Sequence, residues 1–119
     1  MRFVVLRHEM PAESPRASHW DFMLEIEGRL RTWALSAKPQ ASVTVEAERL
    51  ADHRIEYLDI EGPIAGNHGS VTRVDCGRYT TLAETETDWR LTLEGDVLRG
   101  GLHIEQVDGQ RWTFTFDDG

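Results

Sequence analysis

The stretch HWDFMLE, residues 19–25, is the pattern from which the fold of this chain can be predicted. Apolar and polar side chains alternate along it, which is typical of a β-strand with one face in a core. Successive side chains of a strand point to opposite faces, so the apolar face holds Trp20, Phe22 and Leu24. The opposite face holds the other members of the stretch: His19, Asp21, Met23 and Glu25.

A tight turn at Glu27-Gly28 and a second strand over 29–35 complete a β-hairpin, which places Trp33 and Leu35 on inward faces with the apolar face of the first strand. An apolar run over 2–7 precedes the hairpin, and turns that contain Gly or Asp separate most of the short strands after it. These strands are predicted at 55–60, 71–76, 79–82, 89–93, 97–104 and 111–116. The pattern predicts an all-β fold: a compact closed or partly open barrel of about eight short antiparallel strands.

Residues 41–53 are ambiguous, because Val43 and Val45 favour a strand whereas residues 46–51 are good helix formers. We predict one short helix over 46–51 and keep the strand as the alternative. Residues 76–78, Cys-Gly-Arg, are read as a turn between two strands. With 119 residues and no linker or repeat, the chain suits a single domain over 1–119.

The composition narrows the function classes. A formal net charge of −8 argues against binding nucleic acid over the whole surface, although it leaves room for a small basic pocket. No apolar run approaches the roughly 20 residues that cross a bilayer, and the N-terminus does not resemble a signal peptide. The single cysteine, Cys76, cannot form an internal disulfide, so we expect a packed thiol and a cytoplasmic location.

Two histidines and an aspartate suggest a metal site. An imidazole and a carboxylate two residues apart on one strand face, His19 and Asp21, form half of a site for a divalent cation. His8 ends the run 2–7, and if that run pairs with the strand carrying His19, three ligands converge. Ordinary solvent exposure of this face is the alternative. A cupin-like site is another, with Gly62-Pro63 and His68 as its second segment.

A second group of residues suggests acid–base chemistry on a phosphate. His53 lies between Asp52 and Arg54, with Tyr57 four residues on, although the same residues suit a solvated turn. The chain has no phosphate-binding Gly-x-x-x-x-Gly-Lys loop and no Gly-x-Ser-x-Gly nucleophile turn. Nucleotide triphosphate chemistry and serine hydrolysis are therefore unsupported.

Read in order, the motifs resemble the 3′-phosphoesterase domain family of bacterial DNA ligase D, which also has stand-alone members. The segments that resemble the family are FVVLRH at 3–8, HWDFMLE at 19–25, Gly28 with WAL at 33–35, DH at 52–53 with EYLDIEG at 56–62, GSV at 69–71 through GRY at 77–79, and LRG at 98–100. Together they span nearly the whole chain. The resemblance implies a compact β-barrel with little helix.

The resemblance also implies a function. Members of the family use a manganese-type divalent ion to remove a 3′-phosphate or 3′-ribonucleotide from DNA ends. For this chain the resemblance implies the same chemistry on DNA or RNA 3′ ends, with Mn²⁺ as the metal and Zn²⁺ as the alternative. The implied metal ligands are His8, His19 and Asp21, and the implied catalytic residues are His53 and Tyr57. The implied phosphate-binding residues are Lys38 and Arg49. A DNA ligase or polymerase acting in trans is the expected protein partner, and a monomer is the expected state.

The sequence departs from the family at Met23, where the family carries an arginine that grips phosphate, and the interval from His8 to His19 is longer than usual. We expect Met23 to border the site, with Arg29 or Arg31 supplying the charge or with a weak phosphate grip. Two other functions stay open: a non-catalytic barrel that binds nucleic-acid ends or a metal, and a cupin-like metalloenzyme acting on a small molecule.

Overall fold

The structure is a computed structural model that describes residues 1–64, 66 and 68–117. It contains ten strands and a single turn of 3₁₀ helix within these residues. Their bounds are β1 Arg2–Glu9, β2 His19–Ile26, β3 Arg29–Leu35, β4 Thr44–Arg49, β5 His53–Arg54, η1 Ile55–Leu58, β6 Gly62–Pro63, β7 Ser70–Glu84, β8 Asp88–Gly95, β9 Arg99–Asp108 and β10 Arg111–Phe116. No helix in the described part of the chain is long and apolar enough to span a membrane.

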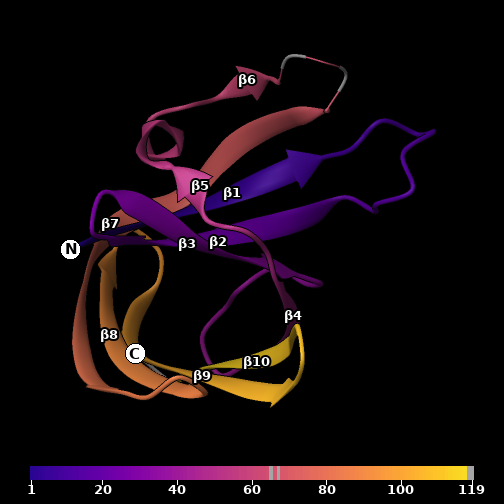
Figure 1. Ribbon diagram of the computed structural model, residues 1–119. Coiled ribbons are helices and arrows are strands. Elements are labelled where there is room, and N and C mark those ends of the chain that lie inside the picture. Colours follow the sequence, from indigo (N-terminus) through magenta and orange to yellow (C-terminus); the bar gives the residue numbers. More distant parts are fainter. Residues whose placement is uncertain (65, 67, 118–119) are drawn as a thin grey trace.

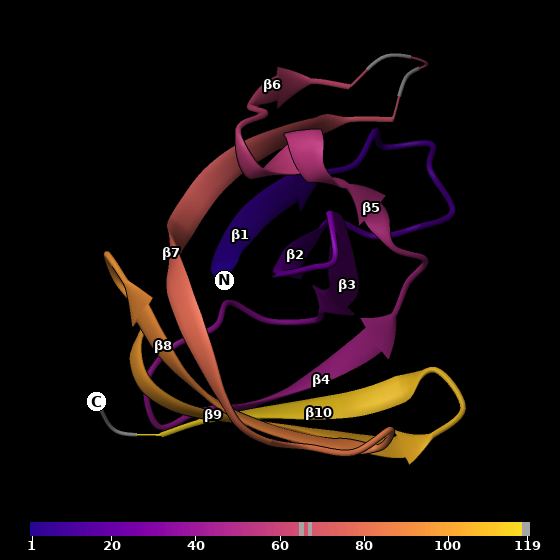
Figure 2. The same cartoon turned by 60° about the vertical axis from the view of Figure 1, so that its left-hand side comes forward.

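Eight antiparallel strands close into a barrel, in the order β1-β2-β3-β4-β10-β9-β8-β7, and β7 pairs back with β1. The two remaining strands are additions, since β5 pairs with β3 and β6 pairs with β7. Figure 2 shows how β7 curves from the part of the barrel that holds β1 to the part that holds β8. The predicted all-β barrel of about eight strands is confirmed.

The barrel interior is filled by aromatic side chains, and the hairpin β2–β3 supplies its centre. Phe22, Leu24, Trp33 and Leu35 are at most 1% exposed and belong to the interior cluster, against which Trp20 is partly buried. The Phe22 ring packs on Phe114 at 5.2 Å between centroids, and Trp33 packs on the same ring at 5.3 Å. The inward face predicted for the hairpin is therefore correct.

The outer face of β1, β2 and β3 carries a second apolar cluster, made of Val4, Leu6, Met23, Leu30, Leu58 and Val71. The segment from β5 to β6, with η1 in its middle, lies over this face and shields the cluster from water (Figure 1). Cys76 packs against the same cluster as a partly buried free thiol, as expected for a small strand residue. Part of the outer face of these strands is thus a second apolar core.

Two local predictions are wrong. Residues 46–51 are not helical, because residues 44–49 form β4, in which Val45 and Ala47 enter the interior and the pairing with β10 and β3 outweighs helix propensity. Residues 55–60 do not form a strand. Ile55, Tyr57, Leu58 and Ile60 pack on the outer cluster, and a helical turn at 55–58 lets this short apolar segment fold onto it.

The turn predicted at 76–78 is also wrong, since β7 runs unbroken through it. Gly77 is needed there for close approach, because a Cβ on it would collide with the carbonyl of Glu94 on β8. Just before it, Asp75 is buried and its carboxylate accepts N–H groups from four residues. These donors are Cys76, Asp96 and Val97 on Oδ1 and Leu98 on Oδ2. Asp75 thereby fixes the turn between β8 and β9.

Candidate metal centre

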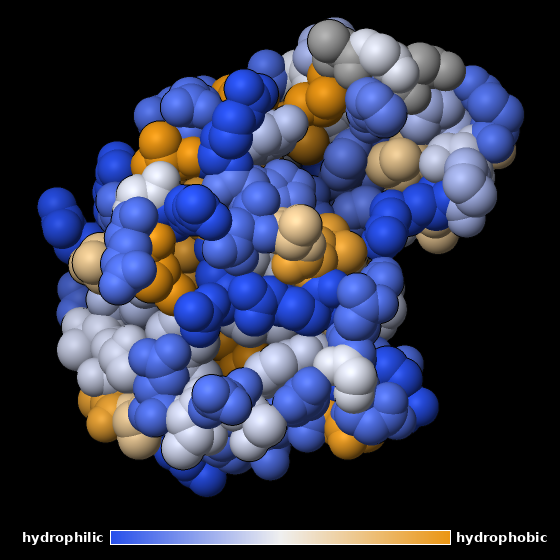
Figure 3. All heavy atoms as spheres, in the orientation of Figure 1, coloured by the Kyte–Doolittle hydropathy of each residue, from blue (hydrophilic) through white to orange (hydrophobic). Residues whose placement is uncertain are grey.

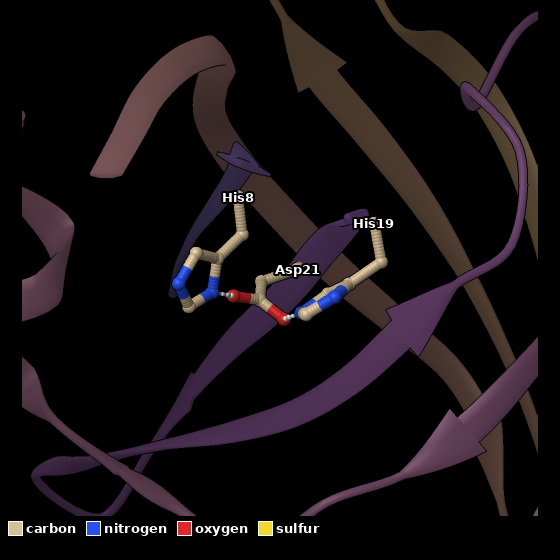
Figure 4. A group of neighbouring side chains, drawn as sticks. All are labelled: His8, His19 and Asp21. Atoms are coloured by element: carbon tan, nitrogen blue, oxygen red, sulfur yellow. Dashed lines mark hydrogen bonds and ion pairs between the residues drawn. The ribbon is translucent and has the colours of Figure 1, made fainter. Parts of the chain in front are cut away.

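The strand register brings the three predicted ligands together on the outer face of the barrel. β1 pairs with β2 so that His8 lies opposite His19 and Leu6 lies opposite Asp21. Directly opposed residues of an antiparallel pair point to the same side, so all three polar side chains project from one face. Figure 4 shows the two imidazoles flanking the Asp21 carboxylate from either side. One ligand atom from each residue lies within 4.8 Å of the other two.

Both imidazoles are oriented by backbone carbonyl groups. Nε2 of His8 lies 2.7 Å from the carbonyl oxygen of His68, and Nδ1 of His19 lies 2.9 Å from that of Ala17. A carbonyl only accepts, so each of these ring nitrogens carries the proton. The opposite nitrogens face the carboxylate: His8 Nδ1 is 3.2 Å from Oδ2 of Asp21, and His19 Nε2 is 3.0 Å from Oδ1. In neutral histidines these two nitrogens are bare lone pairs.

Burial and charge act in opposite directions on the three groups. Asp21 is 2% exposed, and burial alone raises the pKa of its carboxyl. Contact with His19 and His8 outweighs burial and lowers that pKa to about 2. The pKa of His8 is raised chiefly by its contact with Asp21, while burial and the positive charge of Arg16 act against the rise. The carboxylate is therefore ionised across the physiological range.

The donor set fits a divalent cation. Oδ1 of Asp21 is buried and accepts no hydrogen bond from any residue that the structure describes. Nε2 of His19 lies 3.0 Å from this oxygen, but the two groups are not aligned as in a hydrogen bond. Two nitrogen lone pairs that point at a buried carboxylate repel it, unless a proton or a metal ion lies between the nitrogens and the carboxylate. Imidazole nitrogens whose other N–H is fixed by a carbonyl are the usual arrangement of metal-binding histidines. Two imidazoles and one carboxylate suit Mn²⁺ and Zn²⁺ alike.

His53 and Tyr57 are close to each other but not to the three ligands. Their rings pack edge to face with centroids 5.3 Å apart, and Nδ1 of His53 bonds the carbonyl of Ala51 at 3.0 Å. His53 lies opposite Leu30, four residues along β3 from the position opposite Asp21, an offset of about 13 Å at the rise of a strand. Both groups belong to the outer face, separated by the apolar cluster.

The other predicted contacts lie elsewhere. Lys38 is exposed in the segment between β3 and β4. Arg49 is engaged, with its guanidinium 3.1 Å from Asp52 and 5.0 Å from the centroid of the Trp33 ring. Arg31 lies opposite Leu24, a residue of the interior cluster, and contacts Glu84 and the Trp89 ring. It therefore does not face the three ligands.

The expectation that Met23 borders an open pocket is wrong. Met23 shares the face of His19 and Asp21, but its side chain is 0% exposed and is enclosed in the outer cluster. The covering segment with η1 is the reason, because it converts this part of the face into a second core. A substrate phosphate has no direct access to the side chain at position 23.

Several features of the site were not predicted. The carbonyls of Ala17 and His68 orient the ligands, and backbone carbonyls carry no sequence signal. Gly69 does carry one: its φ is +82°, and a Cβ on it would collide with the carbonyl of Glu9. A second group with metal-ligand spacing, Asp88, His103 and Glu105, lies on β8 and β9, where both nitrogens of His103 face carboxylates.

Fold and site define a small closed β-barrel whose outer face carries two histidines and an aspartate that lie close enough together to hold a metal ion. A family profile described as the DNA Ligase D 3′-phosphoesterase domain matches residues 8–112. The chain belongs to this family.

The similar proteins are multifunctional non-homologous end joining proteins named LigD. That of Pseudomonas aeruginosa is 33% identical over 117 residues, which cover 94% of this chain and 13% of that protein. The LigD DNA repair protein of Mycobacterium tuberculosis (strain H37Rv) is 30% identical over 119 residues, 92% of this chain and 15% of that protein. LigD of Mycobacterium bovis has the same identity and coverage. The chain thus spans about one seventh of these relatives.

Proposed function

We propose that this chain is a divalent-metal-dependent phosphoesterase that acts on the 3′ ends of DNA or RNA, removing a terminal 3′-phosphate or 3′-ribonucleotide. Two observations support the proposal: membership of the 3′-phosphoesterase domain family and a donor set that suits a divalent cation. The relatives carry the words "non-homologous end joining" in their names, and end repair is the context proposed for this chain.

The orientation of the two imidazoles carries the proposal. In its neutral form, each histidine ties its N–H to a backbone carbonyl and turns its bare nitrogen toward the buried carboxylate of Asp21. A site built only for stability would place an N–H donor opposite that carboxylate, because burying three acceptors together is costly. A cation that accepts all three lone pairs removes the conflict.

Each residue then has a proposed role. His8, His19 and Asp21 would hold Mn²⁺, with Zn²⁺ as the alternative, and the bound ion would supply Lewis-acid polarisation of a phosphate oxygen. Nδ1 of His53 is tied to Ala51, which leaves Nε2 to move a proton or stabilise developing charge. The Tyr57 ring holds that imidazole from its edge.

The offset between His53 and the three ligands constrains where a substrate lies. The offset is about 13 Å along the strands, so one phosphate group cannot touch both the three ligands and His53, and a substrate that reaches both must extend across the outer face. Lys38 and Arg49 are proposed as more distant phosphate contacts, and Arg49 would first have to leave Asp52. We propose a monomer located in the cytoplasm, with a ligase or polymerase acting in trans on the same ends.

A non-catalytic barrel that binds metal and nucleic-acid ends is the second candidate. The observation in its favour is the enclosed Met23, which leaves the covered face without the arginine expected there. The cupin-like alternative has less support, because His68 gives its backbone carbonyl to the site, while its ring is no member of the three-residue ligand cluster.

The test measures metal binding and phosphate release together. Mn²⁺ affinity is determined by calorimetry, and inorganic phosphate release is followed from a primer–template with a 3′-phosphate, with Mn²⁺ or with EDTA. We expect release only with Mn²⁺, loss of both binding and release in His19→Ala, and little change in the control Val97→Ala, whose exposed side chain lies outside both groups with metal-ligand spacing. Metal binding without release would favour the non-catalytic barrel, and His19→Ala with unchanged affinity would reject the site.

A further inference from the structure

A cleft of about 730 Å³ opens on the outer face of the barrel beside His19. Its roof is the segment 15–18 before β2, and its floor is formed by the end of β3 together with β4 and β10. In Figure 3 the right-hand outline of the molecule is indented between an upper and a lower lobe. The polar and charged lining residues that matter are Arg16, His19, Glu46, Glu48, Arg111 and Thr113. This volume is typical of a site for a small ligand or a nucleotide.

The group of three ligands borders this cleft on the side of His19. On the side of His8, the carbonyl of His68 is bonded to the ring, and Gly69 is packed directly against the backbone of Glu9. On the side of Met23, the outer cluster is covered by η1. His19 is the only one of the three ligands that also lines the cleft. A molecule attached to a phosphate at the ligands therefore has room to extend past His19.

We propose that this cleft receives the 3′-terminal nucleotide of the substrate strand, and that Arg16 at its edge binds the terminal phosphate in place of the arginine absent at position 23. The proposal rests on the proposed function and adds the direction in which the strand leaves the site. Arg16 lies on the segment that joins β1 and β2, between His8 and His19.

Arg16 is well placed for this role. Arg16 lies on the segment 10–18 between β1 and β2. The two ends of this segment are joined by a hydrogen bond of 2.9 Å from the Met10 N–H to the Ser18 hydroxyl. Its guanidinium spans the cleft to Glu48 on β4 at 3.0 Å, with 42% and 46% of the two side chains exposed. An exposed ion pair of this kind contributes about 1 kcal/mol or less, so Arg16 can exchange Glu48 for a phosphate at small cost. A guanidinium also matches phosphate oxygens in a bidentate fashion.

The chemistry of the cleft suits one nucleotide at a strand end. Its charges are balanced, because two arginines, Arg16 and Arg111, line it together with two glutamates, Glu46 and Glu48, so nothing there attracts a row of phosphates. The carboxylates and the Thr113 hydroxyl offer acceptors for the hydroxyl and amino groups of a nucleoside. The net charge of −8 repels the rest of a nucleic acid. Binding in the cleft is therefore confined to the terminal nucleotide of a nucleic-acid strand.

The first experiment blocks the cleft. Thr113 is half-buried on the outer face of β10, and Thr113→Trp fills the floor without touching the ligands. Thr115→Trp is the matched control, on the same strand and face but outside the cleft. Binding of a fluorescein-labelled single strand with a 3′-hydroxyl, which cannot be dephosphorylated, is followed by anisotropy. We expect binding at least about tenfold weaker in Thr113→Trp and unchanged binding in Thr115→Trp.

The second experiment removes the cation. Calorimetry with inorganic phosphate on the Mn²⁺-loaded protein compares Arg16→Gln with Arg90→Gln, an exposed arginine on β8 outside the cleft. We expect Arg16→Gln to weaken phosphate binding about 10- to 100-fold, the range for one charge-assisted contact, with Mn²⁺ affinity unchanged. Thr113→Trp should leave phosphate binding as it is, since phosphate alone does not occupy the cleft.

The outcomes separate the two proposals. Equal strand binding by Thr113→Trp and Thr115→Trp, or equal phosphate binding by Arg16→Gln and Arg90→Gln, would overturn the inference about the cleft. Failure of the wild-type protein to bind Mn²⁺ or to release phosphate would instead remove the proposed function. The strand-binding comparison is run with EDTA as well, so that it gives an answer in either case.

Discussion

Replacing Gly69 by alanine should weaken metal binding although Gly69 is not a ligand. Its φ of +82° costs an alanine about 1–2 kcal/mol, and the new Cβ would collide with the carbonyl of Glu9. The backbone at 68–69 must then move away from β1, and the hydrogen bond of 2.7 Å from His8 Nε2 to the His68 carbonyl breaks. Losing the partner that orients a metal-binding histidine typically weakens affinity 10- to 100-fold, or about 1.4–2.7 kcal/mol.

The assay is calorimetric titration of Mn²⁺ or Zn²⁺ into Gly69→Ala and into a matched control. Gly28→Ala is that control, because its φ of +79° imposes the same backbone cost while a Cβ there meets nothing within 4 Å. Both variants should lose similar conformational stability from the left-handed backbone, and only Gly69→Ala should lose affinity. If the two variants bind metal equally well, the carbonyl of His68 does not orient His8 and the reasoning is refuted.

Three further predictions concern stability. Phe22→Ala should lower the free energy of unfolding by about 3–5 kcal/mol in urea titrations, because the ring is fully buried at the centre of the barrel, and a loss below about 1 kcal/mol would contradict the packing. Asp75→Ala should lower the free energy of unfolding by about 3 kcal/mol or more, because it removes the buried carboxylate that accepts N–H groups from four residues, whereas the exposed Asp108→Ala should stay within about 0.5 kcal/mol. Burial raises the pKa of Tyr79 to about 12, so the folded protein keeps a proton that the unfolded chain loses near pH 10. Its contribution to stability should be complete below about pH 10 and decline toward about pH 12, and a decline equally steep in Tyr79→Phe would rule this out.

The hairpin and the convergence of His8, His19 and Asp21 could be predicted because their signals are short in range. Alternation over residues 19–25 determines which side chains enter the barrel, and the same alternation places His19 and Asp21 together. The addition of His8 required only that two neighbouring segments pair, which adjacent strands usually do. The resemblance to the family pointed to the same residues.

Other features depend on contacts that the local sequence does not encode. Residues 46–51 have the composition of a helix, yet β4 is held between β3 and β10, and β10 comes from the other end of the chain. Residues 55–60 have the composition of a strand, yet their apolar side chains pack on the apolar cluster on the outside of the barrel. In both segments, tertiary packing outweighs a propensity of a few tenths of a kcal/mol per residue.

Met23 shows where reasoning from strand faces alone reaches its limit. A residue that alternates with ligands was expected to line their pocket, and the register does place Met23 beside Asp21 on that face. The two ends of this face differ in exposure, however. The end with His19 borders a cleft, whereas the end with Met23 is covered by η1. An arginine at position 23 would need the covering segment to make room, whereas Arg16 reaches the open end from the segment before β2. A cation can contact a phosphate more readily where the face is open. We therefore expect the phosphate-binding cation to come from the segment between His8 and His19, and not from position 23.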